Sequence, residues 1–273
     1  MNKNTTKRSF IAILIFLGIV TLIGVFAPYI ATHDPLTASL REALLPPSRD
    51  HWMGTDLLGR DLFSRVVYGV RTSISISLSL VLITMIGGSF IGIISGYFGG
   101  RLDAMLTGIS SVMLAFPEMI LALAIAGILG RGTLNAFITL ASIGWVKYAR
   151  LSRGIVIKTR NRDFFKAAKV TGSKDSYIMW RYLLPETMPT MLITAAMDIG
   201  TVLLSFASLS FLGLGISVET PEWGAMLSEG RAYLETAPWL VIFPGVAIFI
   251  VITAFNIFGD TVRDVLDPKN ATN

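Results

Sequence analysis

The chain has 273 residues, of which 53% are hydrophobic and only 15% are charged, and its mean hydropathy is +0.65. A soluble domain of this size could not bury so much apolar surface and keep a wettable exterior, so the composition predicts an integral membrane protein and excludes an ordinary cytosolic enzyme. The absence of cysteine excludes disulfides and thiolate metal sites, and the net charge of +5 fits basic cytoplasmic loops with no nucleic-acid partner.

Six windows are apolar and long enough to cross a membrane, which takes about 20 residues of helix. They are residues 10–30, 73–98, 104–129, 133–149, 188–218 and 238–258. The third window contains only Glu118 as a charged residue and the fifth contains only Asp198, whereas Lys147 shortens the uncharged part of the fourth. The sequence therefore predicts an all-α, polytopic bundle of six transmembrane helices surrounded by membrane lipid.

The first window follows Lys3, Lys7 and Arg8 but is too long for a usual signal core and lacks a clear cleavage site, which predicts an uncleaved anchor. With the N-terminus inside, the loops on the cytoplasmic side receive 16 of the 23 Lys and Arg residues, so both termini are predicted to be cytoplasmic. The predicted order is a cytoplasmic N-terminus (1–9), a first span (10–30), an outer segment (31–72), a transmembrane domain (73–258) with a cytoplasmic loop (150–187), and a cytoplasmic tail (259–273).

ATP binding and coupling to an ion gradient each leave recognisable residues in a membrane protein. No Gly-Lys pair occurs, so a phosphate-binding loop of the Walker A type is absent. Glu118 and Asp198 are the only ionisable groups well inside the uncharged windows, and the two histidines, His33 and His51, both fall in the outer segment, which excludes a histidine metal site within the membrane. These features predict a pathway subunit that is not an enzyme, binds no cofactor or metal, and takes its energy from another subunit.

The predicted cytoplasmic loop is too apolar and aromatic for a freely solvated segment. Gly172 and Pro185 predict two short helices at an angle, one of them ending near Pro185. A groove on a partner protein would bury such a helix, and a loop that lies on the membrane surface is the alternative.

This loop resembles the EAA loop of ABC importer permeases, in which a short coupling helix docks in a cleft of the ATPase subunit. The resemblance rests on Ala167-Ala168, Gly172 and Leu183-Leu184-Pro185 at the family's spacing, although Lys166 stands where the motif has Glu and Tyr182 where it has Ile. It implies that the coupling residues are Phe164, Phe165, Lys166, Ala167, Ala168, Gly172, Tyr182, Leu184 and Pro185.

Further segments are similar to the permeases of dipeptide, oligopeptide and nickel importers. They are residues 51–61 (HWMGTDLLGRD), 96–100 (GYFGG), 115–117 (AFP), 209–215 (LSFLGLG), 221–224 (PEWG), 259–260 (GD) and 263–264 (RD). The resemblance implies a type I ABC importer permease fold and the shorter, C-type subunit. It also implies a second homologous permease, two P-loop ATPases that hold ATP and Mg, an extracytoplasmic substrate-binding protein, and a location in the bacterial inner membrane.

Asp198, Glu118 and Phe206 are the candidate pathway residues, although Glu118 could equally be a polar plug. Peptide-importing members of the family carry a Glu where this chain has Phe206, and the stretch 198–200 resembles nickel-type members. An unpaired carboxylate at Asp198 would attract a positive centre, so nickel or a metal chelate is the favoured cargo, with dipeptides or oligopeptides as the alternative.

Four residues, Glu219, Glu222, Trp223 and Glu229, form a candidate rim for docking the binding protein, with an ordinary solvated loop as the alternative. Gly88, Gly92 and Gly96 form a small-residue face that packs either within the subunit or against the second permease. An ion-coupled secondary transporter and a structural membrane anchor remain as rival functions; the first would need more ionisable groups inside the spans, and the second would not need the long cytoplasmic loop.

Overall fold

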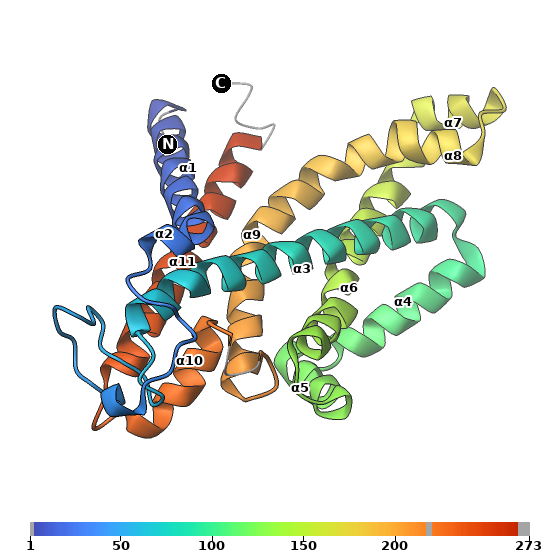
Figure 1. The fold of residues 1–273 in the computed structure, drawn as a ribbon. Coiled ribbons are helices and arrows are strands. Elements are labelled where there is room, and N and C mark those ends of the chain that lie inside the picture. Colours follow the sequence, from blue (N-terminus) through green and yellow to red (C-terminus); the bar gives the residue numbers. More distant parts are fainter. Residues whose placement is uncertain (1–2, 217–219, 267–273) are drawn as a thin grey trace.

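A computed structural model describes residues 3–216 and 220–266, and this part of the chain is helical with a single isolated β-bridge (Figure 1). The helices are α1 (Lys3–Val25), α2 (Ala27–Ile30), η1 (Leu40–Glu42), α3 (Leu62–Phe98), α4 (Gly100–Leu114), α5 (Glu118–Leu129), α6 (Thr133–Thr159), α7 (Asp163–Val170), α8 (Asp175–Ile178), η2 (Met179–Leu183), α9 (Leu184–Phe211), α10 (Trp223–Gly230), η3 (Arg231–Tyr233) and α11 (Trp239–Leu266). The predicted tail, 259–273, is helical as far as Leu266, and residues 267–273 lie outside the described residues.

Three helical runs among the described residues are long and apolar enough to cross a membrane: α3, the run Asp175–Phe211, and α11. The bent pair α4 and α5 adds a fourth if it counts as one span. The apolar part of α1 is shorter, and α6 does not reach the same apolarity. The all-α prediction is confirmed, and the six-span prediction is confirmed in part.

Two predicted spans differ from the observed helices. The third, 104–129, was expected to be continuous, but α4 ends at Leu114, α5 begins at Glu118, and the two helices are bent by 96°. Pro117 explains the break, since proline has no N–H to donate and disfavours helical geometry at the residue before it. The second predicted span begins early, at Leu62, because the Asp61 carboxylate caps α3 by accepting a hydrogen bond from the Ser64 amide at 2.8 Å.

The small-residue face of α3 packs against α6 of the same chain. A Cβ atom on Gly88 would overlap the carbonyl oxygen of Trp145, and one on Gly92 would overlap that of Ala149. A Cβ atom on Gly96 would lie 2.9 Å from Cβ of Val156. The three glycines therefore serve packing within the subunit, the first of the two alternatives.

The remaining long helices gather around α9. It packs against α11 and α3, while α1 lies beside α11 (Figure 1). The rings of Phe10 and Phe258 stack across the α1–α11 contact with centroids 6.3 Å apart. The buried core behind these helices includes Leu203 and Trp223.

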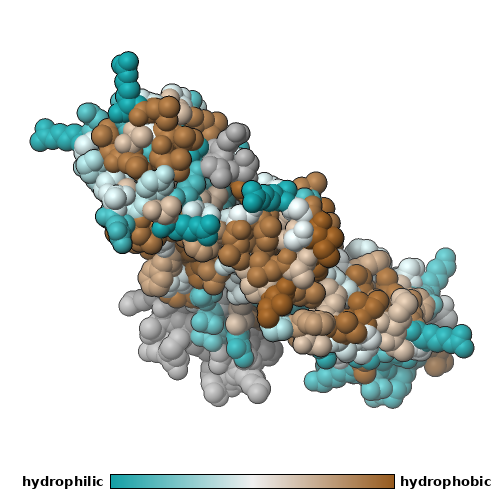
Figure 2. Space-filling model, turned by 90° about the horizontal axis from the view of Figure 1, so that it is seen from below, coloured by the Kyte–Doolittle hydropathy of each residue, from teal (hydrophilic) through white to brown (hydrophobic). Residues whose placement is uncertain are grey.

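The two longest segments between the predicted spans lie at opposite ends of the long helices (Figure 1). In Figure 1 the segment before α3 and helix α10 lie at the lower left, whereas α7 and α8 lie at the upper right. Apolar side chains cover much of the face seen in Figure 2, and hydrophilic groups gather toward its two ends. This distribution suits a molecule whose middle faces lipid and whose ends face water.

A buried ion-pair network ties the segment before α3 to α10. Arg60 contacts Asp56 at 2.6 Å and Glu229 at 3.0 Å, and Arg65 contacts the same two carboxylates at 3.4 and 3.5 Å. The Arg65 side chain has no exposed surface, so its charge depends on these partners. Arg60 and Arg65 therefore have a structural role.

Replacing Gly92 by Ala should lower the stability of the chain by about 1–3 kcal/mol, because the added methyl group must push α3 away from α6. Thermal unfolding of the purified protein in detergent measures the loss. Gly87→Ala is the matched control, since its Cβ atom would meet nothing within 4 Å. Equal unfolding temperatures for the two variants would contradict the close contact of α3 and α6.

Replacing Arg65 by Met should cost about 3–5 kcal/mol, because Glu229 and Asp56 would stay buried with one cation fewer. The same unfolding measurement applies. Arg49→Met removes an exposed arginine in the same segment and should leave stability within about 0.5 kcal/mol of the wild type. A full loss in the Arg49 variant would show that net charge, and not the buried network, is responsible.

Candidate functional site

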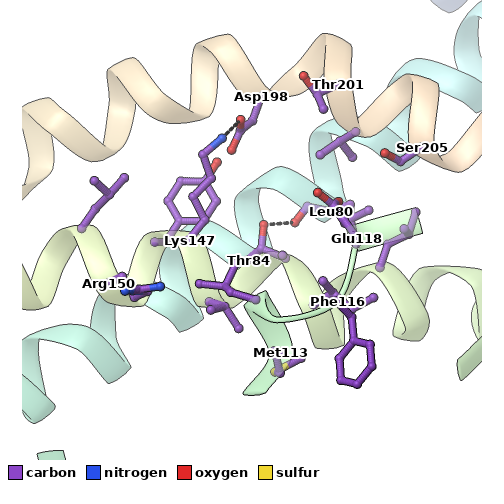
Figure 3. Close-up of a pocket in the computed structure, with 18 residues that line it drawn as sticks. Leu80, Thr84, Met113, Phe116, Glu118, Lys147, Arg150, Asp198, Thr201 and Ser205 are labelled. Atoms are coloured by element: carbon purple, nitrogen blue, oxygen red, sulfur yellow. Dashed lines mark hydrogen bonds and ion pairs between the residues drawn. The ribbon is translucent and has the colours of Figure 1, made fainter. Parts of the chain in front are cut away.

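A cavity of about 460 Å³ lies between α3, α6, α9 and the break between α4 and α5 (Figure 3). Its walls are mainly apolar, and hydroxyl groups come from Thr84, Tyr148, Thr201 and Ser205. Four charged residues also line it: Glu118, Lys147, Arg150 and Asp198. An apolar cavity with a few converging polar groups is typical of a ligand pathway or binding site.

Helical periodicity brings the polar groups of α9 to one side of the cavity. Asp198, Thr201 and Ser205 are spaced by three and four residues and therefore share a helix face. Lys147 and Arg150 are three residues apart on α6 and line the cavity from that helix (Figure 3). The site thus combines two anionic and two cationic side chains in one space.

Asp198 is paired, which corrects the prediction of an unpaired carboxylate. The Lys147 ammonium group donates to Oδ1 of Asp198 (Figure 3). The Asp198 side chain is 11% exposed and that of Lys147 is 55% exposed, so the lysine also reaches the cavity space. The partners are 51 residues apart in the sequence, and the only sequence signal for Lys147 was its position inside the fourth apolar window.

The other two pathway candidates separate. Glu118 is the first residue of α5, directly after Pro117, and lines the same cavity as Asp198 (Figure 3). The two carboxylates that were predicted to belong to the pathway therefore face one cavity. Phe206 does not line this cavity. It is 1% exposed in a core cluster with Leu80 and Leu209, so the structure gives its side chain a packing role.

The predicted coupling segment has one packed face and one exposed face. In α7, Phe165 and Ala168 are buried against a cluster that includes Tyr97, Val156 and Leu183. Phe164, Lys166 and Ala167 are exposed on the other side. The segment therefore presents an apolar and basic surface at this end of the molecule while its inner face anchors it to α3 and α6.

Gly172 ends α7 in the way its sequence position predicts. Its φ angle is +76°, which glycine adopts without a steric cost. The amide of Ser173 donates to the carbonyl of Ala168 at 3.1 Å, and the amide of Gly172 donates to that of Lys169, also at 3.1 Å. These two bonds form the Schellman motif that closes a helix C-terminus.

Pro185 does not end a helix, contrary to the prediction. A single helical run continues from Asp175 to Phe211, with Pro185 in the first turn of α9. The π-helical turn Met179–Leu183 precedes it, and the Leu184 amide donates to the carbonyl of Met179. This wider turn accommodates a residue that has no N–H to donate. Tyr182 and Leu184 are half-buried there.

The predicted docking rim is wrong for the residues whose positions are described. Glu222 is 1% exposed and Trp223 is fully buried, with the Trp223 indole donating to the carbonyl of Val66 at 3.0 Å. The Glu222 carboxylate instead caps α10 by accepting from the Gly224 and Ala225 amides, each at 2.8 Å.

Glu229 belongs to the buried ion-pair network, with its side chain 8% exposed. Burial raises the pKa of Glu229, and the charges of Arg65 and Arg60 oppose that rise. Its carboxylate therefore faces the protein interior and not a binding protein. Glu219, the last residue of the predicted rim, lies outside the described residues.

Known proteins support the resemblance stated from the motifs. The family model described as the inner membrane component of binding-protein-dependent transport systems matches residues 88–272. The chain is 40% identical over 269 residues to the dipeptide transport system permease protein of Alkalihalophilus pseudofirmus, covering 98% of this chain and 88% of the relative. It is 37% identical over 259 residues to the nickel transport system permease protein of Escherichia coli K12, covering 95% and 94%.

Among solved structures, the chain is similar to the MetNI methionine ABC transporter in an inward-facing conformation. The TM-score is 0.59 at 16% identity, and the match covers 75% of this chain and 97% of the other. At this identity the likeness concerns the fold alone. Peptide and nickel relatives match at similar identity, so sequence similarity favours neither cargo. From the matched residues and the relatives, the chain belongs to the family of binding-protein-dependent transport system inner membrane components and is a non-catalytic permease of the inner membrane.

Proposed function

We propose that the chain forms half of the translocation pathway of an ATP-driven importer. The observation that carries the proposal is the cavity in which Asp198 and Glu118 lie with Lys147 and Arg150. A second, homologous permease would supply the other wall, two P-loop ATPases would bind ATP and Mg, and an extracytoplasmic binding protein would deliver the cargo. ATP-driven closure of the ATPases would move the pathway between inward- and outward-facing states.

The proposal includes six spans with both termini in the cytoplasm, where α1 and α6 are the first and fourth. The charges of α6 do not prevent it from crossing a membrane, because Lys147 and Arg150 line the cavity and not only lipid. Ionisable groups inside membrane proteins are tolerated where they face a partner or a water-filled space. In this topology α7 lies in the cytoplasm and the segment before α3 lies outside.

The charges of the cavity favour a cargo that carries both signs of charge. A short peptide has an ammonium group that suits Asp198 and Glu118 and a carboxylate that suits Lys147 and Arg150. Nickel or a metal chelate is the second candidate. It is favoured by the resemblance of residues 198–200 to nickel-type permeases, and a chelate with carboxylate groups would also find cations here.

The cargo test is the uptake of a labelled dipeptide and of labelled nickel, in parallel, in cells with and without this gene. We expect dipeptide uptake to fall when the gene is removed. Asp198→Asn and Lys147→Met should each lower it about tenfold or more, since either change leaves a charge in the cavity without its partner. Asp34→Asn removes an exposed carboxylate far from the cavity and serves as the control.

Loss of nickel uptake alone would replace the peptide by the metal chelate as cargo and leave the pathway intact. Unchanged uptake of both labels would contradict the importer proposal. Normal dipeptide uptake in both cavity variants would show that Asp198 and Lys147 are not in the pathway.

The coupling role of α7 is tested at Gly172. Gly172→Val should lower uptake about tenfold while ATP hydrolysis by the assembled transporter continues, because a β-branched residue disfavours the positive φ that ends α7. Gly130→Val is the matched control. Gly130 also has a positive φ, of 83°, and open space around it, but it follows α5 away from the coupling segment. Wild-type uptake by the Gly172 variant, or an equal defect in both, would contradict the coupling role.

A further inference from the structure

Both histidines of the chain meet at one carboxylate. Nδ1 of His51 lies 2.8 Å from Oδ1 of Asp61, and Nδ1 of His33 lies 3.8 Å from the same oxygen. The two imidazole rings have centroids 4.8 Å apart. Each of the three side chains offers a ligand atom, and these atoms lie within 4.8 Å of one another. The residues come from three separate parts of the segment before α3, so only the fold assembles them.

Hydrogen bonds to the start of α3 hold the cluster in place. Asp61 is the capping residue of α3 and has no exposed side-chain surface. The backbone amide of His33 donates to Oγ of Ser64 at 3.0 Å, and the hydroxyl group of Thr32 donates to Oδ2 of Asp61 at 3.2 Å. These hydrogen bonds fix Asp61 and the backbone of His33 at the start of α3.

The hydrogen bonds of Asp61 leave one oxygen directed at the histidines. Oδ2 accepts from the amide and the hydroxyl group of Ser64 at 2.8 and 2.7 Å and from Thr32. Oδ1 has His51 as its hydrogen-bond partner and His33 as its next neighbour. This division resembles a carboxylate whose one oxygen is oriented by the protein while the other binds a ligand.

The cluster is also open to solvent on one side. His33 is 45% exposed at its side chain, whereas His51 is 9% exposed. His33 borders a cavity of about 450 Å³ that is also lined by Asp34 and Tyr68. An ion can enter there, and the exposed imidazole of His33 has room to turn toward it.

We propose that His33, His51 and Asp61 form a binding site for a divalent transition-metal ion, such as Zn²⁺ or Ni²⁺. This proposal departs from the expectation, drawn from the sequence, that the chain binds no metal. Neutral imidazoles and a carboxylate are common ligands of these ions, with bond lengths of about 2.0–2.2 Å. A small movement of His33 would bring its ring to that distance. The ion would replace the hydrogen bond between Nδ1 of His51 and Oδ1 of Asp61, and the proton of that bond would pass to solvent. Solvent on the open side would supply the remaining ligands.

The site shares no residue with the cavity between α3, α6 and α9. The metal-site proposal therefore does not depend on which cargo the transporter carries. A bound ion would join residues 32–34 and the loop around His51 to the start of α3. This is the same region that the ion pairs of Arg60 and Arg65 connect to α10. The ion would thus stiffen the segment before α3.

The test is a titration of the purified protein with Zn²⁺, using a preparation without a polyhistidine tag. Calorimetry measures the stoichiometry and the Kd, and X-ray absorption at the zinc edge identifies the ligand atoms. We expect one ion per chain with nitrogen and oxygen ligands. His33→Gln should raise the Kd at least about tenfold, as the loss of one ligand requires. Because His33 is half-exposed, this variant should fold, whereas variants of the buried His51 or Asp61 need an unfolding measurement beside them.

Asp34→Asn is the matched control, because it removes an exposed carboxylate from the same cavity and should leave the Kd unchanged. The same titration with Ni²⁺ reports whether the site takes both ions. The absence of a saturable site, or an equal Kd in wild type and His33→Gln, would overturn the proposal. Since metal binding and not uptake is measured, this outcome is independent of the cargo test.

Discussion

Gly88, Gly92 and Gly96 let α3 lie directly against the backbone of α6, because a Cβ atom at any of them would meet α6 at a distance that real structures avoid. A Cβ atom on Gly88 would overlap the backbone of Trp145 and the side chain of Tyr148. These two residues lie before and after Lys147 in α6. The position of α6 then decides where Lys147 points, and so which residue of α9 it reaches. In a bundle without strong hydrophobic drive between helices, such close van der Waals packing holds the arrangement.

Buried charges follow from that arrangement at two places. Lys147 neutralises Asp198 beside the cavity, and Arg60 and Arg65 neutralise Glu229 and Asp56 near α10. In both, a charge removed from water is tolerated because a partner from a distant part of the chain meets it. The pair at the cavity is half open to solvent and suits a pathway, whereas the network near α10 is closed and suits a fixed scaffold.

The predicted coupling segment shows how much of a local structure its sequence motif specifies. Gly172 ends α7 as its position in the EAA-like pattern predicts, since the closing motif is local and depends on one residue with positive φ. Pro185 was predicted by the same kind of argument to end a helix and does not, because the π-helical turn before it removes the need for its N–H. Pro117, in contrast, lies in the break between α4 and α5, where the third predicted span is bent by 96°.

The sequence by itself determined the membrane class, the all-α architecture, the glycine face of α3 and the permease family, since these depend on composition, periodicity and local motifs. Only the tertiary structure decided that Asp198 is paired with Lys147, that Glu222 and Trp223 are buried, and that His33, His51 and Asp61 meet. Each of these outcomes joins residues that are separated along the chain. A hydropathy window records what a segment contains, but the partner of a charge depends on which helices lie side by side.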